Sequence, residues 1–119
     1  MGTYISLIRK EKIDFLIGEG FYNNPQAVVD RIKINRNKVV LLPPQVKTIK
    51  KLKPRIPVLI FCASNDKTTT TGDAKQFAKA NKATIIEFDG DHLSGFGVMT
   101  KEIPGDEYSD RIVDFVKRM

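Results

Sequence analysis

The clearest hydrophobic pattern lies in the second half of the chain, where an unbroken apolar run is followed by helix-like and strand-like segments. Residues 57–63 (PVLIFCA) are continuously apolar, which is typical of a strand covered on both faces within a parallel sheet. Residues 83–88 (ATIIEF) predict a second strand. A helix of about ten residues from near Asp73 and a last helix from about Asp106 to Arg118 complete the order β-α-β-α, which predicts parallel strand pairing.

The helix between the two strands has recognisable start and packing signals. Thr70 is a suitable N-cap residue, because its hydroxyl can accept a backbone N–H from the first turn. Ala74, Phe77 and Ala78 have the spacing of one buried stripe. We therefore expect this helix to cover one face of the sheet.

Residues 1–53 have a less regular pattern and are interpreted as helical pieces joined by irregular chain. Residues 4–8 have helical spacing, and Asn24 followed by Pro25 is a good helix start. Residues 38–42 (KVVLL) predict a short strand. Apolar residues at every third position over 46–52 predict one more short amphipathic helix.

The composition is that of one globular domain. The chain has 119 residues, of which 41% are apolar and 29% are charged. We expect a single domain over residues 1–119, with a helical, cap-like segment at 1–53 and the β-α-β-α unit at 54–119. The longest apolar run, residues 56–63, is far shorter than the ~18 residues of a membrane span, so no membrane partner is expected.

The single cysteine and the single histidine limit the possible sites. Cys62 has no partner for an internal disulfide, which fits a reducing compartment and predicts a cytoplasmic protein. A cysteine-based zinc site is excluded, because one Cys and one His cannot supply its ligands. Asp89, Asp91 and His92 could hold a divalent ion, but they lie in one short loop without a fixed fourth ligand. We expect neither a metal nor a cofactor.

Positive charge is concentrated in one stretch of the chain. The net charge is +6, and no acidic residue lies between Arg31 and Asn65. Such a block can bind nucleic acid, but no aromatic residue is interleaved to stack on bases, so a solvated lysine-rich face is favoured. The block contains nine basic residues: Arg31, Lys33, Arg36, Lys38, Lys47, Lys50, Lys51, Lys53 and Arg55.

Two chemically useful side chains follow the two predicted strands. Asp66 lies three residues after the first strand and His92 four residues after the second. The carboxyl ends of neighbouring parallel strands meet at one edge of a sheet, so this carboxylate and imidazole could meet there. Such a pair is the orienting half of a nucleophilic triad. On spacing alone, the favoured interpretation is that Asp66 is a turn-forming residue and His92 a surface histidine.

The segment from residue 56 to 96 resembles the C-terminal end of an α/β-hydrolase-fold protein. Residues 63–66 (ASND) are similar to the family's acid turn, with Ala in place of the usual Gly. Residues 90–92 (GDH) are similar to its histidine turn, and residues 111–116 (RIVDFV) to its terminal helix. The resemblance covers roughly residues 46–119. It implies an α/β fold with a partial parallel sheet, in which Asp66 is the triad acid and His92 the general base.

The family's nucleophile motif is absent from this chain. That nucleophile lies in a G-x-S-x-G turn between a strand and a helix, and none of the four serines has this pattern: Ser6, Ser64, Ser94 and Ser109. Cys62 lies inside the predicted buried strand, where a free cysteine is usually a small apolar residue.

The resemblance therefore implies a partial ester or amide hydrolase, inactive alone. It would act on a small-molecule ester or amide only when a complementary N-terminal chain supplies the nucleophile. Since the strands that should flank residues 57–63 are not evident, we also expect a homo-oligomer. The alternative is a non-catalytic oligomeric module whose basic surface binds an acidic partner. A nucleic-acid partner is not expected.

Overall fold

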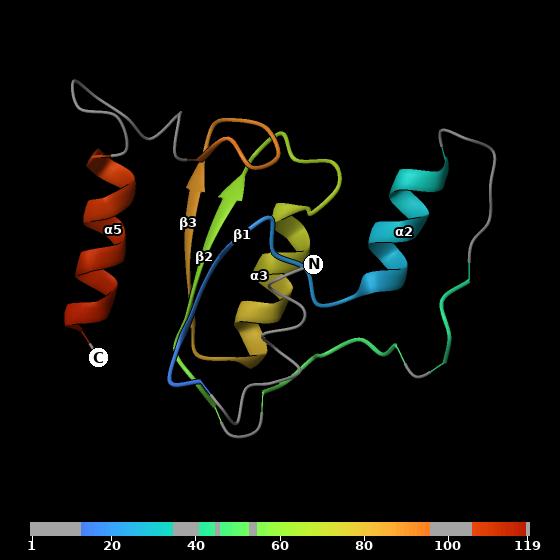
Figure 1. Ribbon diagram of the computed structural model, residues 1–119, viewed down its shortest axis with the longest axis horizontal. Coiled ribbons are helices and arrows are strands. Elements are labelled where there is room, and N and C mark those ends of the chain that lie inside the picture. The colour runs from blue at the N-terminus through green and yellow to red at the C-terminus, as the bar shows by residue number, and fades with distance from the viewer. Residues whose placement is uncertain (1–12, 35–40, 45, 53–54, 96–105, 119) are drawn as a thin grey trace.

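The protein has an α/β fold built on a three-stranded parallel sheet. The computed structural model describes residues 13–34, 41–44, 46–52, 55–95 and 106–118. The strands are β1 (Leu16–Glu19), β2 (Val58–Ala63) and β3 (Ala83–Phe88), in the order β1-β2-β3. The helices are α2 (Pro25–Ile34), α3 (Thr71–Ala80) and α5 (Asp106–Lys117). Figure 1 shows the sheet between α5 and α3, with α2 beyond α3.

The central strand β2 explains why the sheet is covered on both faces. All six of its residues are buried, as the continuous apolar run predicted. Alternate side chains point to opposite faces, and they pack in two separate clusters. On one face, Val58, Ile60 and Cys62 pack with Ala74 and Phe77 of α3. On the other face, Leu59, Phe61 and Ala63 pack with Tyr108, Ile112 and Phe115 of α5.

The β2-α3-β3 unit matches its sequence prediction closely. β2 pairs with β3 in parallel, with Ala63 opposite Phe88 at the carboxyl end. Thr70 caps α3, since its hydroxyl accepts the Asp73 N–H at 3.3 Å. Ala74 and Phe77 of α3 are fully buried.

α2 begins where the Asn-Pro pair predicted. The Asn24 side-chain oxygen accepts the Ala27 N–H at 3.2 Å, which satisfies one N–H of the first turn. Val28 packs with Tyr22 in a small buried cluster, whereas Ile32 is exposed. The Arg31 guanidinium pairs with Asp73 at 2.7 Å and donates to the Thr68 carbonyl at 3.0 Å. These two contacts attach α2 to the start of α3.

The first half differs from its prediction in three places. Residues 16–19 form strand β1, which pairs in parallel with β2, whereas residues 1–53 were interpreted as helical pieces joined by irregular chain, with no strand expected at 16–19. Leu41 and Leu42 lie outside any strand, and residues 46–52 form no helix. The remainder of the predicted strand (38–40) and the predicted helix at residues 4–8 lie outside the described residues. That residues 1–119 form one domain stays a prediction.

Hydrogen bonds to distant segments explain why residues 46–52 are not helical. The Ile49 N–H donates to the Asn23 carbonyl at 2.9 Å, and the Asn23 amide donates back to the Ile49 carbonyl at 2.7 Å. The Leu52 N–H donates to the Asn81 side chain at 2.7 Å. Because these backbone groups are satisfied by other segments, a helix has no advantage here, and Leu52 is buried from an irregular backbone.

Candidate functional site

Asp66 and His92 lie together at the carboxyl end of the sheet. Backbone hydrogen bonds continue between the two loops beyond the strands, from the Ser64 N–H to the Phe88 carbonyl (2.9 Å) and from the Asn65 N–H to the Gly90 carbonyl (3.0 Å). His92 Nδ1 lies 2.7 Å from Asp66 Oδ2. The contact predicted from the order of strands and loops is therefore present.

Asp66 is held in place by several donors. Its Oδ1 accepts the N–H groups of Thr68 (2.9 Å) and Thr69 (2.8 Å), and its Oδ2 accepts the Thr69 hydroxyl at 2.6 Å. Only 3% of the side chain is exposed. Burial acts to raise the pKa of Asp66, but the hydrogen bonds from Thr69, His92 and Thr68 outweigh it and lower this pKa below its ordinary value. Asp66 is thus a turn-forming residue and the partner of the imidazole at once.

The contacts of His92 determine its tautomer. Both of its hydrogen bonds to described residues engage Nδ1, with Asp66 and with Thr69 Oγ1 at 3.2 Å. The Asp66 carboxylate only accepts, so Nδ1 carries the proton. In the neutral imidazole, Nε2 then holds the lone pair, and no described residue hydrogen-bonds to it. Since 40% of the side chain is exposed, Nε2 can accept a proton from another group.

The end of β1 brings a third segment against the histidine. Gly20 has φ +65°, and a Cβ there would lie 2.8 Å from Leu93 Cδ2 and 3.1 Å from His92 Cε1. Leu93 itself has φ +59° and an exposed side chain. A residue larger than glycine at position 20 would therefore push against the imidazole.

Glu19, which sequence reasoning missed, links the histidine loop to α5. Its carboxylate accepts the Gly95 N–H at 2.8 Å and the Tyr108 hydroxyl at 3.0 Å. The Tyr108 ring stacks on Phe61 with centroids 4.2 Å apart. Burial and the hydrogen bond to Glu19 raise the pKa of Tyr108 to about 12. The sequence signal was a carboxylate at the end of a strand, but β1 had not been recognised.

Neither the described serines nor Cys62 is positioned by a hydrogen bond to His92. Ser64 donates to Asp89, and Ser94 bonds only within its own turn to Asp91. Cys62 lies inside β2, and its pKa is raised to about 11, chiefly by burial. Among the serines that the structure describes, none hydrogen-bonds to His92; Ser6 lies outside that part of the chain.

Three further expectations from the sequence concern a metal ion, the basic block and a membrane span. Asp89, Asp91 and His92 do not converge, since Asp89 accepts from Ser64 and from Asn65 (3.3 Å) while His92 turns to Asp66. Over the described ranges, no three potential ligands could hold a metal ion together. In the basic block, Arg31 is committed to an internal ion pair. None of the described helices is both long and apolar enough to cross a membrane.

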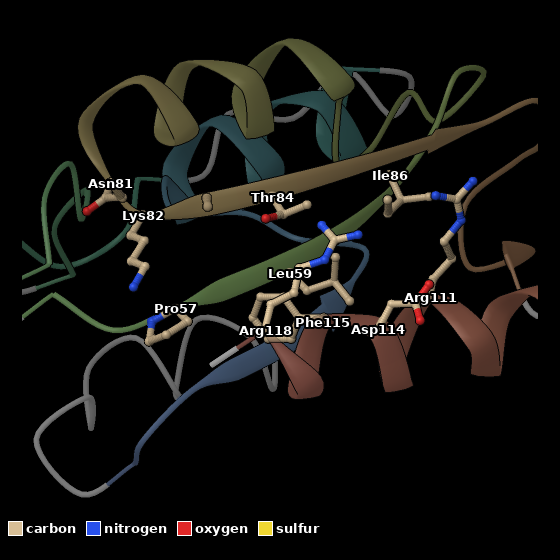
Figure 2. Close-up of a pocket in the computed structure, with 11 residues that line it drawn as sticks. Pro57, Leu59, Asn81, Lys82, Thr84, Ile86, Arg111, Asp114, Phe115 and Arg118 are labelled. Carbon is tan, nitrogen blue, oxygen red and sulfur yellow. The ribbon is translucent and has the colours of Figure 1, made fainter.

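A cavity of about 310 Å³ lies at the other end of the sheet, between β2, β3 and the last turns of α5. Its lining includes Pro57, which directly precedes β2, and Ala83, the first residue of β3, and Figure 2 shows side chains of α5 facing it. It does not include Asp66 or His92. The described residues therefore form two separate polar regions, one at each end of the sheet.

The fold is similar to half of a known esterase. A Pyrococcus furiosus esterase, Pf2001, superposes with a TM-score of 0.67 at 14% sequence identity, covering 98% of this chain and 48% of that one. A second crystal form of the same esterase gives a TM-score of 0.66 at 16% identity, covering 96% of this chain. The chain thus spans about half of that esterase. No family model and no curated protein sequence matches it.

Proposed function

We propose that this chain is the C-terminal, acid- and base-bearing portion of an α/β-hydrolase-type esterase. Asp66 is the acid that orients the imidazole, and His92 is the general base. The observation that carries the proposal is the 2.7 Å contact between His92 Nδ1 and Asp66 Oδ2, which leaves Nε2 without a bond to a described residue. The half-length likeness to an esterase supports the same assignment.

In this proposal, each residue has a defined role in proton transfer. The Asp66 carboxylate keeps the proton on Nδ1 and stabilises the imidazolium when it forms. Nε2 takes the proton of a serine hydroxyl as that hydroxyl attacks the ester carbonyl, and then gives it to the leaving alcohol. Thr69 fixes the carboxylate through the hydroxyl bond at 2.6 Å.

The nucleophile is proposed to come from polypeptide outside residues 1–119. The four serines of the chain lack the G-x-S-x-G pattern, and the described ones do not contact His92. A complementary segment that lies beside β1 would bring a serine to the same end of the sheet as Nε2. The chain would accordingly be inactive alone and act on small esters only when complemented.

The test is to incubate the purified chain with p-nitrophenyl acetate and with a fluorophosphonate probe that labels activated serines. We expect no serine-hydrolase turnover and no labelled serine, because no described serine hydrogen-bonds to the imidazole and none of the four serines lies in a G-x-S-x-G turn. An intact serine esterase under the same conditions is the positive control. Stoichiometric labelling of one serine of this chain would overturn the proposed source of the nucleophile.

A further inference from the structure

We propose that the cavity at the amino end of the sheet is a binding site for a small carboxylate with an apolar body. The cavity of about 310 Å³ is at the lower end of the sizes that hold small ligands. Figure 2 shows the cavity between the last turns of α5 and the neighbouring strands β2 and β3. The proposal uses neither Asp66 nor His92, so it stands or falls separately from the proposed function.

The inner wall of the cavity is apolar. Leu59 and Ile86 line it from the sheet, and Phe115 lines it from α5. All three belong to the cluster that packs α5 against the sheet. Leu59 is buried, whereas Ile86 and Phe115 are half-buried and leave apolar surface open to the cavity. This wall offers contact to an alkyl or aryl group.

The rim of the cavity carries uncommitted positive charge. Lys82 and Arg118 line it, and neither forms an ion pair with a described residue. Figure 2 shows the Arg118 guanidinium extending over the sheet. Thr84 also lines the cavity, and its hydroxyl has no hydrogen bond to a described residue. An arginine and a hydroxyl that line the same cavity both supply donors for a carboxylate.

Two further charged residues, Arg111 and Asp114, line the rim. Arg111 contacts Glu107 at 3.7 Å, and Asp114 lies on the Arg111 side of the cavity in Figure 2, away from Lys82. The cations of the lining that form no ion pair with a described residue are therefore Lys82 and Arg118. An apolar wall with a cationic rim selects a ligand with both properties, rather than a simple anion or a hydrocarbon.

The experiment is a titration of the full chain with hexanoate, followed by amide chemical shifts in NMR. We expect shifts localised to Leu59, Thr84 and Ile86, with a Kd on the order of 1 mM. Acetate has the same charge without the apolar body, and hexanol has a similar body without the charge. Both should bind at least about tenfold more weakly.

Two charge-matched variants assign the effect to the cavity. Arg118→Gln should weaken hexanoate binding about tenfold, because it removes a charge-assisted contact. Lys117→Gln, on the same helix but outside the cavity lining, should leave binding unchanged. The proposal is overturned if hexanoate shows no localised shifts, if hexanol binds as well, or if the two variants behave alike.

Discussion

The two ends of the sheet differ in whether their polar side chains have partners among the described residues. At the carboxyl end, Asp66, Thr69 and His92 satisfy one another, and the carboxylate is almost fully buried. At the amino end, Lys82 and Arg118 face a cavity without ion pairs to described residues. Satisfied buried groups fix one geometry, as a catalytic pair requires, whereas uncommitted groups can bind a ligand. The comparison predicts that removing a satisfied buried group at the carboxyl end costs stability and that removing an uncommitted group at the amino end does not.

The largest expected effect is that of removing the buried carboxylate. Asp66→Ala leaves the N–H groups of Thr68 and Thr69 without their acceptor, so we expect a loss of about 3 kcal/mol in the free energy of unfolding. The control is Asp91→Ala. Asp91 lies in the histidine loop but is exposed, so this substitution should change stability by less than about 0.5 kcal/mol. Urea unfolding measures both. Equal losses would remove the distinction between the two carboxylates.

The next largest loss in the free energy of unfolding is expected on removing the Glu19 carboxylate, which joins the histidine loop to α5. Glu19→Ala removes the acceptor of the Gly95 N–H and of the Tyr108 hydroxyl, which should cost about 2 kcal/mol. Glu87→Ala, whose carboxylate pairs with Lys75 at the surface, should cost about 0.5 kcal/mol or less.

The pKa of Tyr108 tests the hydrogen bond between Tyr108 and Glu19 without a measurement of stability. In Glu19→Gln the pKa of Tyr108 should fall from about 12 but stay above its ordinary value of 10.0, because burial is the larger cause of the shift. Spectroscopic titration of the tyrosines measures it. A pKa of Tyr108 that is unchanged by the substitution would show that Glu19 does not accept its hydroxyl.

Acidification should weaken the carboxyl end through Asp66. The pKa of Asp66 in the folded chain lies below its ordinary value of 3.8. Its contribution to stability is therefore complete above that ordinary value and is lost as the pH falls through the lower, folded pKa. Asp66→Asn should show a smaller loss of stability over this acidic range than the unsubstituted chain. Parallel losses in both would mean that other carboxyl groups account for the acid sensitivity.

The smallest expected change in the free energy of unfolding is that of two matched threonine substitutions, one at each end of the sheet. Thr69→Val removes the hydroxyl bond to Asp66 (2.6 Å) and should cost about 1 kcal/mol. Thr84→Val removes a hydroxyl that lines the cavity without a described partner, so stability should change by about 0.3 kcal/mol or less. Comparable losses at the two positions would contradict the contrast between the ends.

The sequence predicts long, regular elements and fails at short ones. β2, α3, β3 and α5 were predicted because each has a sustained apolar pattern and clear end signals. β1 was missed because it has only four residues, including a glycine, too few to establish an alternating pattern. The spacing over residues 46–52 indicated a helix, whereas its backbone bonds to Asn23 and Asn81 instead.

The site was predictable only as far as topology determines it. Asp66 and His92 follow adjacent parallel strands, so their contact could be expected from chain order. That Thr69 donates to the carboxylate depends on the conformation of a loop with four threonines, and its neighbours offer the same hydroxyl. The cavity depends on how the end of α5 lies over the sheet, which no local pattern specifies.

The most direct test of the central claim is the protonation state of the single imidazole. With the histidine nitrogens labelled with ¹⁵N, NMR distinguishes the two tautomers of neutral His92 without ambiguity of assignment. We expect the proton on Nδ1 and the lone pair on Nε2, with this preference lost in Asp66→Ala but kept in Asp91→Ala. A proton on Nε2, or a tautomer ratio that does not depend on Asp66, would contradict the assignment of Asp66 and His92 as the acid and base of a hydrolase.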